Sequence, residues 1–127
     1  MSVIELNSEN FEQTIRDNNL VIVDFWAPWC GPCRSFAPLY EQASAKHPDV
    51  VFAKVNTEEQ HDLAAYFEIR SIPTLMVFRE QIILFAQPGA LPAAALETVI
   101  DKTRALDMDE VRRQISEAGQ QPPPTGG

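Results

Sequence analysis

Two long apolar segments constrain the fold of this chain more than any other feature of its sequence. Leu20–Trp26 reads LVIVDFW, in which Asp24 is the one charged residue, and Val50–Asn56 reads VVFAKVN. Strands that are apolar on both faces are typical of the interior of a sheet whose two sides are covered by helices. We therefore expect both segments to be buried strands of a sheet that lies between two layers of helix.

The segments between and after these strands carry the periodicity of helices or of a hairpin. Helices are predicted at about residues 8–18, with Ser8 as N-cap, and then at residues 31–46, 58–67 and 92–105. Thr74–Phe78 and Ile82–Ala86 flank a tight connection, which predicts an antiparallel hairpin. Strands and helices alternate early in the chain, which favours parallel strands joined by crossover helices. The predicted fold is an α/β domain of three layers, with a central mixed sheet of about five strands flanked by helices.

The pattern changes after residue 106. Asp107 and Glu110 resemble a helix-capping pair, and four apolar residues share one helical face: Met108, Val111, Ile115 and Ala118. An isolated helix of about a dozen residues is marginal in water, so we expect this one to pack on the domain or to mediate self-association. Residues 120–127 read QQPPPTGG, which predicts a disordered tail. The predicted organisation is a domain at residues 1–106, an extra helix at 107–119 and a tail at 120–127.

Length and charge argue against several classes of function. A chain of 127 residues can bury one substantial core, and its net charge of −8 disfavours nucleic acid or an anionic membrane as partner. Its apolar runs are far shorter than the roughly 18 residues that a membrane span needs. The first ten residues hold neither Lys nor Arg and no long apolar run, unlike a secretory signal peptide. We therefore expect a cytoplasmic protein with no nucleic-acid or membrane partner.

The two cysteines of the chain, Cys30 and Cys33, stand at the predicted start of the helix that follows the first buried strand. Residues at this spacing lie on one face of a helix and are close enough for a disulfide. The unpaired N–H groups and the dipole of a helix start stabilise a thiolate at Cys30, and the thiolate is the form that attacks a disulfide. Cys33, one turn further along, is expected to be shielded and to resolve the mixed disulfide formed at Cys30. The pattern predicts a redox-active pair.

Two other interpretations of the pair remain open. Two structural cysteines can occur at this spacing by chance, and a C-x-x-C motif can supply half of a zinc site. Zinc needs two further ligands, and the sequence offers His47, His61 and carboxylates, none of them in a paired spacing. We therefore expect no metal and favour the redox pair.

The residues around the pair resemble the active-site segment of the thioredoxin family. Residues 25–33 read FWAPWCGPC, and the resemblance continues at Pro38, at residues 54–56, 69–74 and 89–91, and spans about residues 3–106. It implies the thioredoxin fold, no bound cofactor and the activity of a general protein-disulfide reductase. It also implies that electrons come from NADPH through a flavoprotein thioredoxin reductase and pass to client proteins that contain disulfides. Gly31 and Pro32 between the cysteines are typical of the reducing members of the family, whereas oxidases and isomerases usually carry a His there.

Two charged residues of the predicted strands are candidates for the catalytic machinery. Burial of Asp24 in an apolar strand should raise the pKa of its carboxyl group and leave it able to exchange a proton. The resemblance implies that Asp24 helps to deprotonate Cys33 and that Lys54, on the next strand, is the partner of Asp24. The alternatives are a solvated or paired carboxylate at Asp24 and a solvated surface lysine at Lys54.

The resemblance also implies a docking surface for client proteins. Pro73 resembles the cis-proline that faces the disulfide in the family, although most X–Pro bonds are trans and the sequence alone would not predict a cis bond. With that geometry the backbone of Ile72 can pair with an extended client segment. An ordinary core aromatic is the alternative for Trp29. The implied surface consists of Trp29, Gly31, Pro32, Ile72, Pro73, Gly89 and Ala90.

Several positions depart from the family pattern. Glu80 and Gln81 stand where the usual hairpin has Asn-Gly, at positions that need a positive φ, and Glu68 replaces a usual Gly. The strand Ile82–Ala86 lacks the Lys that commonly protects a sheet edge. This apolar strand and the extra helix favour a second hypothesis, in which the fold is an interaction or chaperone-like module with secondary redox activity. An oxidase or isomerase is a third hypothesis.

Overall fold

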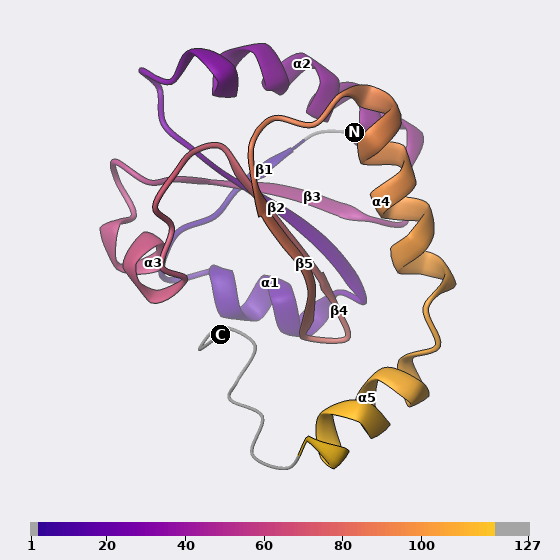
Figure 1. The fold of residues 1–127 in the computed structure, drawn as a ribbon. Helices are drawn as coiled ribbons and strands as arrows, with labels where there is room; N and C mark the ends of the chain where they lie inside the picture. Colours follow the sequence, from indigo (N-terminus) through magenta and orange to yellow (C-terminus); the bar gives the residue numbers. More distant parts are fainter. Residues whose placement is uncertain (1–2, 119–127) are drawn as a thin grey trace.

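A computed structural model describes residues 3–118, and Figure 1 shows their arrangement. The sheet has the strand order β1-β3-β2-β4-β5, in which β4 runs antiparallel to both of its neighbours. The predicted α/β fold, with a mixed sheet of five strands flanked by helices, is confirmed. None of the helices within residues 3–118 is long and apolar enough to cross a membrane. The elements are β1 (Ile4–Glu5), α1 (Phe11–Asp17), β2 (Leu20–Trp26), α2 (Gly31–Lys46), β3 (Val51–Asn56), α3 (His61–Tyr66), β4 (Thr74–Arg79), β5 (Ile82–Pro88), α4 (Ala93–Ala105) and α5 (Met108–Glu117).

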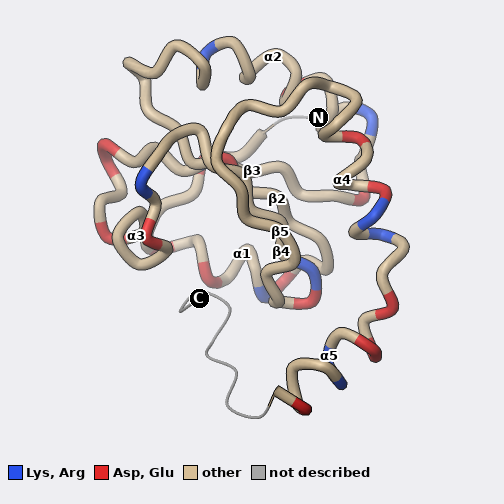
Figure 2. The backbone as a smooth tube through the Cα atoms, in the orientation of Figure 1, with Lys and Arg blue, Asp and Glu red and all other residues tan. Residues whose placement is uncertain are grey.

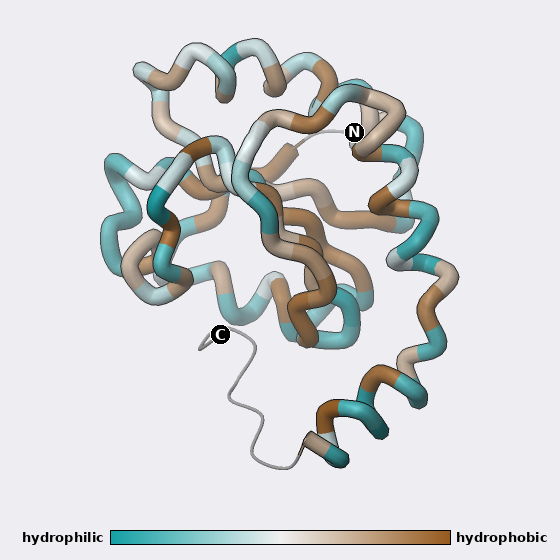
Figure 3. The backbone as a smooth tube through the Cα atoms, in the orientation of Figure 1, coloured by the Kyte–Doolittle hydropathy of each residue, from teal (hydrophilic) through white to brown (hydrophobic). Residues whose placement is uncertain are grey.

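Helices cover both faces of the sheet and close two apolar clusters against it. α2 and α4 lie over one face, and α1 and α3 lie over the other (Figure 1). Ile22 of β2 belongs to the cluster on the α2 side, whereas Val23 belongs to the cluster on the α1 side. Both faces of β2 are therefore buried, as its apolar sequence requires. Hydrophobic residues gather in the central strands (Figure 3), whereas most charged residues lie on the helices and loops (Figure 2).

The first helix is shorter than the sequence predicts, because a different residue caps the turn before it. The predicted helix covers residues 8–18 with Ser8 as N-cap, but α1 spans Phe11–Asp17. The side chain of Asn7 accepts hydrogen bonds from the backbone N–H groups of Glu9 at 2.8 Å and of Asn10 at 2.9 Å. These bonds fold residues 8–10 into a turn, so the prediction of Ser8 as N-cap is wrong.

The third helix also begins later than predicted. The predicted helix covers residues 58–67, whereas α3 spans His61–Tyr66. The side chain of Asn56 accepts a hydrogen bond from the backbone N–H of Glu58 at 2.9 Å, which stabilises a turn at residues 57–59. An Asn or Asp side chain that binds the backbone two residues on is typical of a turn rather than of a helix interior.

The turn between β4 and β5 has the backbone conformation that an Asn-Gly pair favours, although the sequence has Glu80 and Gln81 there. Glu80 has a φ of 52° and Gln81 has a φ of 70°. Both φ angles lie in the left-handed region. In this region the backbone of an L-residue that has a Cβ atom is strained, whereas that of glycine is not. The expectation of positive φ at these two positions is confirmed.

A bulge interrupts the exposed edge of the sheet at β5. Phe78 pairs with Ile83 and Val77 pairs with Phe85, so Leu84 has no partner on β4. A bulge twists an edge strand and hinders its pairing with another chain. The edge that lacks a protecting Lys therefore carries a different protective feature.

The start of α5 is fixed to the domain by polar contacts. The guanidinium group of Arg79, at the end of β4, donates a hydrogen bond to the carbonyl oxygen of Leu106 at 2.9 Å. The side chain of Asp107 accepts hydrogen bonds from the backbone N–H groups of Asp109 at 3.0 Å and Glu110 at 3.3 Å. Asp107 is therefore the N-cap of α5, as its position predicts.

The apolar face of α5 is buried only at its first turn. Met108 is 5% exposed, Val111 and Ile115 are half-buried, and Ala118 is exposed. Arg112 forms an ion pair with Glu80 of the hairpin turn. The helix therefore packs on the domain through its N-terminal half, whereas self-association stays a prediction. The tail predicted at residues 120–127 lies outside the described residues.

Candidate active site

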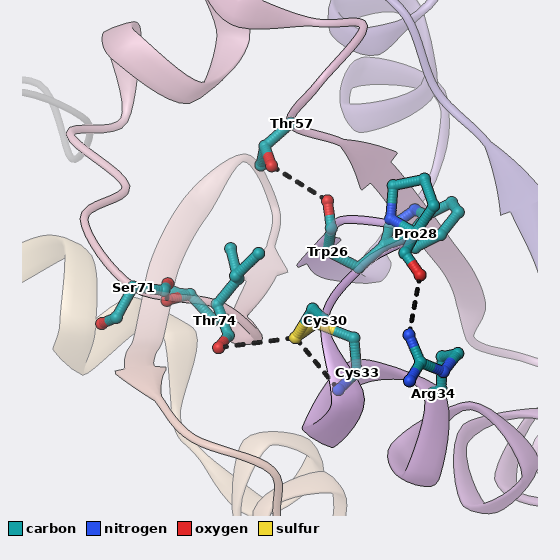
Figure 4. Close-up of a disulfide and its surroundings, with 9 residues drawn as sticks. Trp26, Pro28, Cys30, Cys33, Arg34, Thr57, Ser71 and Thr74 are labelled. Carbon is teal, nitrogen blue, oxygen red and sulfur yellow. Dashed lines mark hydrogen bonds between the residues drawn. A yellow bond between two sulfur atoms is a disulfide. The ribbon is translucent and has the colours of Figure 1, made fainter.

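Cys30 and Cys33 form a disulfide at the N-terminus of α2, directly after β2 (Figure 4). The carbonyl oxygen of Ala27 accepts a hydrogen bond from the N–H of Cys30 at 3.2 Å, so the chain turns sharply before α2 begins at Gly31. Pro32 lies in the first turn of the helix, where its missing N–H costs no helical hydrogen bond. The Cα atoms of the cysteines are 5.2 Å apart, a separation typical of a disulfide.

The backbone at the helix start stabilises negative charge on Cys30. Cys30 is the N-cap of α2, and its Sγ accepts a hydrogen bond from the N–H of Cys33 at 3.2 Å. The first turn of α2 carries no acidic residue that would oppose this charge. When the disulfide is reduced, the N–H group and the positive end of the helix dipole remain beside the Cys30 sulfur. They favour its thiolate, which is the form that attacks a disulfide.

Cys33 is shielded, as predicted, but Cys30 is buried to the same degree, so exposure does not distinguish the two cysteines. Cys30 is 4% exposed and Cys33 is 3% exposed in the disulfide form. Both pack with Ala27, and Trp26 and Ile72 lie against this cluster. Because the S–S bond holds the two sulfurs together, the same neighbours cover both. The difference between the cysteines lies in hydrogen bonding at the helix start.

The loop that precedes β4 lies beside the disulfide. The peptide bond between Ile72 and Pro73 is cis, and the carbonyl oxygen of Ile72 lies 3.8 Å from the Sγ of Cys30. The N–H of Gly89 donates a hydrogen bond to the carbonyl oxygen of Pro73 at 2.7 Å, which joins the end of β5 to this loop. Figure 4 shows Ser71 and Thr74 on the side of this loop that lies next to Cys30, at the N-terminal end of α2. The loop before β4 therefore lies at Cys30, and the end of β5 is joined to that loop.

The surface around the disulfide is open to an approaching chain. Trp29 is 65% exposed, so its interpretation as a core aromatic is wrong. Apart from its chain neighbours and the backbone of its own helix, no atom of residues 3–118 lies within 4 Å of where a Cβ atom at Gly31 would stand, and Pro32 is exposed. The other residues predicted for docking are the half-buried Ile72, the buried Pro73, and the exposed Gly89 and Ala90. Their role in client binding stays a prediction.

Burial raises the pKa of the Asp24 carboxyl group from 3.8 to about 7, while the positive charge of Lys54 lowers it. Asp24 is 4% exposed, which rules out the solvated carboxylate, and its Oδ1 has no hydrogen-bond partner among residues 3–118. It lies two residues after Ile22 on β2 and thus on the face that α2 covers. A carboxyl group in this environment exchanges its proton near neutral pH.

Lys54 is a half-buried residue with two partners rather than a solvated surface lysine. It stands opposite Asp24 in the register of β2 and β3, but its Nζ lies 3.8 Å from Oε1 of Glu5 on β1. The same Nζ lies 4.8 Å from the ring centroid of Trp26, where the face of the indole attracts a cation.

Sequence reasoning does not identify two neighbours of this region. The hydroxyl of Tyr40, from α2, donates a hydrogen bond to the carbonyl oxygen of Ala53 at 2.8 Å. Burial raises the pKa of Tyr40 well above its ordinary value, and the negative charge of Asp24 raises it further. Glu5 stands opposite Lys54 on β1. A strand of two residues shows no periodicity and its register is invisible in one sequence, so only the charge of Glu5 signals it.

The described part of the chain offers no site for a metal ion. No group of three or more His, Cys, Asp or Glu side chains within residues 3–118 could hold one. His47 is engaged elsewhere, because its Nε2 lies 2.8 Å from Oε1 of Glu97. The zinc interpretation of the cysteine pair therefore has no ligand set among these residues.

Comparison with known proteins places this site in a family. The model of the thioredoxin family matches residues 2–102. A protein of Streptomyces coelicolor described as putative thioredoxin 2 is 60% identical over 116 residues, covering 91% of this chain and 87% of its own length. Thioredoxin C-3 of Corynebacterium nephridii is 42% identical, over 78% of this chain and 69% of its own length. Among solved structures, oxidised thioredoxin from Plasmodium falciparum matches with a TM-score of 0.74 at 37% identity, covering 82% of this chain and 100% of that one.

The family match includes both cysteines and every residue that surrounds them. It ends before α5, but the alignment with the Streptomyces protein spans 91% of the chain and so must extend into α5. A cysteine pair at a helix N-terminus can pass between dithiol and disulfide, which is the chemistry that the family performs on disulfide-containing substrates. The chain therefore belongs to the thioredoxin family and is a thiol–disulfide oxidoreductase.

Proposed function

We propose that this chain is a general protein-disulfide reductase, with Cys30 as the attacking thiolate and Cys33 as the resolving thiol. The observation that carries the proposal is the hydrogen bond from the N–H of Cys33 to the Sγ of Cys30 at the N-terminus of α2. It selects Cys30 as the sulfur that is more stable as a thiolate. Gly31 and Pro32, which are typical of reducing members of the family, support reduction as the direction of the reaction.

The reaction proceeds through a mixed disulfide. The Cys30 thiolate attacks one sulfur of the client disulfide, bonds to it and releases the other client sulfur as a thiolate. Cys33 then loses its proton and attacks the Sγ of Cys30, which releases the second client sulfur as a thiolate. The client gains two electrons, and the dithiol becomes the Cys30–Cys33 disulfide that the structure contains.

Asp24 is the proposed acceptor of the proton from Cys33. A carboxyl group whose pKa is about 7 is ionised in part at neutral pH and still binds a proton well, which suits a general base. Asp24 lies on the strand that leads into the turn before α2, on the face that α2 covers. Lys54 favours the ionised form of Asp24.

The proposed client segment binds in an extended form across the exposed side of the disulfide. Its backbone pairs with Ile72, whose carbonyl oxygen lies 3.8 Å from the sulfur that becomes linked to the client. Gly31 leaves room for the client backbone, and Trp29 contributes exposed apolar surface. Pro32, Pro73, Gly89 and Ala90 complete the proposed surface.

We infer that a flavoprotein thioredoxin reductase returns the disulfide to the dithiol with electrons from NADPH. The exchange reaction itself needs only thiols and a disulfide, so the reductase meets this chain as another thiol partner at Cys30. The cycle requires NADPH in the same compartment, which we take to be the cytoplasm.

Reduction of insulin by the full chain, with NADPH and a thioredoxin reductase, tests this proposal. The chain should consume NADPH and precipitate the freed insulin chains, and Cys30→Ser should do neither. Dithiothreitol in place of the reductase separates the two halves of the cycle. If the chain reduces insulin with dithiothreitol but not with NADPH and the reductase, the proposed recharging step is wrong. If Cys30→Ser reduces insulin as fast as the wild-type chain does, the proposed disulfide-reductase function is wrong. A chaperone-like module would act equally well with either cysteine replaced.

A further inference from the structure

Three charged residues form a row across neighbouring strands on the face of the sheet that α2 covers. Glu5 of β1 stands opposite Lys54 of β3, and Lys54 stands opposite Asp24 of β2. On the other side of Asp24 the row continues with an apolar residue, Leu75 of β4. Residues in register on adjacent strands point to the same side of a sheet. The single positive charge of the row therefore lies between two carboxyl groups.

Lys54 is held by the outer carboxylate rather than by the buried one. Its Nζ lies 3.8 Å from Oε1 of Glu5, and the face of Trp26 lies 4.8 Å away. Because β3 separates β1 from β2, Glu5 attracts the ammonium group in the direction away from Asp24. The side chain of Glu5 is 49% exposed and that of Lys54 is 34% exposed, so this pair lies at the edge of the buried region.

Asp24 has no other charge to balance it. Among residues 3–118 it forms no ion pair, and its Oδ1 lacks any hydrogen-bond partner. From α2 it faces Tyr40, which stays neutral because its pKa is raised. The nearby part of α4 contributes Leu96 and Ile100 to this side of the sheet. The ionisation of Asp24 therefore depends on the position of the Lys54 ammonium group.

We propose that Glu5 is a positioning residue for thiol–disulfide exchange, which holds Lys54 away from Asp24 and so sets the pH at which the buried acid ionises. The link to catalysis rests on the proposed role of Asp24 as proton acceptor. Loss of the Glu5 charge lowers the pKa of Asp24 in two ways. It frees Lys54 to approach Asp24, and it removes a negative charge about 10 Å away, two strand spacings across the sheet. Both changes favour the ionised carboxylate.

Titration of the Asp24 carboxyl carbon by NMR in the oxidised protein measures this effect directly. Glu5→Gln should lower the pKa of Asp24 by roughly half a unit, a size limited by the exposure of Glu5 to solvent. Glu9→Gln removes the same charge from an exposed position in the turn before α1 and should leave the pKa of Asp24 unchanged. An unchanged pKa in Glu5→Gln, or an equal shift in Glu9→Gln, would overturn the proposal.

A double-mutant cycle shows whether Glu5 acts through Lys54. In a Lys54→Met background, the additional change Glu5→Gln should shift the pKa of Asp24 much less than it does in the wild-type chain. A shift of undiminished size would mean that Glu5 acts without Lys54, which contradicts the positioning role. A purely structural contribution of Glu5 would lower the melting temperature and leave the titration of Asp24 in place.

The pH profile of insulin reduction separates this inference from the function on which it rests. The acidic limb of the profile should move to lower pH in Glu5→Gln by the same amount as the pKa of Asp24. If Asp24→Asn keeps the acidic limb of the wild-type profile, the proton-acceptor role is wrong, whereas the NMR titration still decides the effect of Glu5. If the pKa moves in Glu5→Gln and the limb does not, Glu5 is not a positioning residue for catalysis.

Discussion

At the scale of single residues, the raised pKa of the Asp24 carboxyl group should make the stability of this chain depend on pH. Desolvation raises its pKa from 3.8 to about 7 in the folded protein. The folded protein therefore binds this proton more tightly than the unfolded chain does. The stabilising effect of this bound proton is fully present below pH 3.8 and is lost as the pH rises through the pKa of Asp24 in the folded protein. Above neutral pH the domain holds a buried carboxylate that opposes folding.

Asp24→Asn should remove this dependence of stability on pH. The free energy of unfolding of the variant should exceed that of the wild type by an amount that is smallest near pH 4. That excess should be larger by up to about 4 kcal/mol at pH 8, since one pKa unit corresponds to about 1.4 kcal/mol. Urea denaturation at several pH values measures it, with Asp101→Asn on the exposed side of α4 as a control that should follow the wild type. A difference that does not change with pH would contradict the raised pKa of Asp24.

The residues of the site differ in how far one sequence could predict them. Cys30 and Cys33 are recognisable because their chemistry depends on local position at a helix start, and Asp24 because a charge interrupts an apolar strand. The equal burial of the two cysteines depends on the loop at Ile72, which is 39 or more residues away in the chain. The contact between Glu5 and Lys54 depends on strand register, which a single sequence does not contain.

At the scale of elements, the end of α3 carries a conformational cost at Glu68. The N–H of Glu68 bonds to the carbonyl oxygen of Ala65 at 3.0 Å, and the N–H of Ile69 bonds to that of Ala64 at 2.9 Å. These two bonds are those of a Schellman motif, whose first residue after the cap adopts a left-handed conformation and is usually Gly. Glu68 has this conformation, with a φ of 55°.

Glu68→Gly should therefore stabilise the domain. It relieves a left-handed conformation that costs a residue with a Cβ atom about 1 kcal/mol, and it sacrifices only an exposed contact with Arg70 at 4.0 Å. Glu68→Ala is the matched control, because it loses the same side chain but keeps the Cβ atom. Thermal or urea denaturation should show a gain for Glu68→Gly alone. Equal stability of the Gly and Ala variants would show that the backbone at this position is not strained.

The elements themselves could mostly be predicted, because burial on both faces and helical periodicity are local patterns. β2, α2, β3 and the β4–β5 hairpin lie where the sequence predicts them to within about two residues. The start of α1 could not, because Ser8 is a good capping residue in the sequence, whereas in the structure the hydrogen bonds to Asn7 fold residues 8–10 into a turn and α1 begins only at Phe11. The bulge at Leu84 results from the packing of both faces of an edge strand and leaves no mark in the alternation of residues.

At the scale of the whole molecule, α5 packs on the domain away from the active site. It contacts the domain through the buried Met108 and through the ion pair of Arg112 with Glu80 of the hairpin turn. That turn lies at the opposite end of β4 from Pro73 and the disulfide. The helix is therefore suited to stabilise the hairpin and not to bind clients at Cys30.

Removal of residues 107–127 should lower the free energy of unfolding by about 2 kcal/mol, the typical value for burial of one Met side chain. Met108→Ala in the full chain should reproduce most of this loss, whereas Gln114→Ala, on the exposed side of α5, should not. Denaturation curves measure stability, and insulin reduction by the truncated chain should stay within about twofold of the wild-type rate. Sedimentation of both chains tests self-association. Equal stability of the truncated and full chains would contradict a packed α5.

Trapping of the mixed disulfide tests the central claim, which assigns the attack to Cys30 and the resolution to Cys33. Cys33→Ser keeps the backbone N–H that bonds to the Sγ of Cys30, so the attacking thiolate remains stabilised while the resolving sulfur is absent. Mass spectrometry after mixing with insulin should show a covalent adduct at Cys30 in Cys33→Ser and none in Cys30→Ser. Accumulation of the adduct at Cys33 in Cys30→Ser, with none in Cys33→Ser, would contradict the assignment.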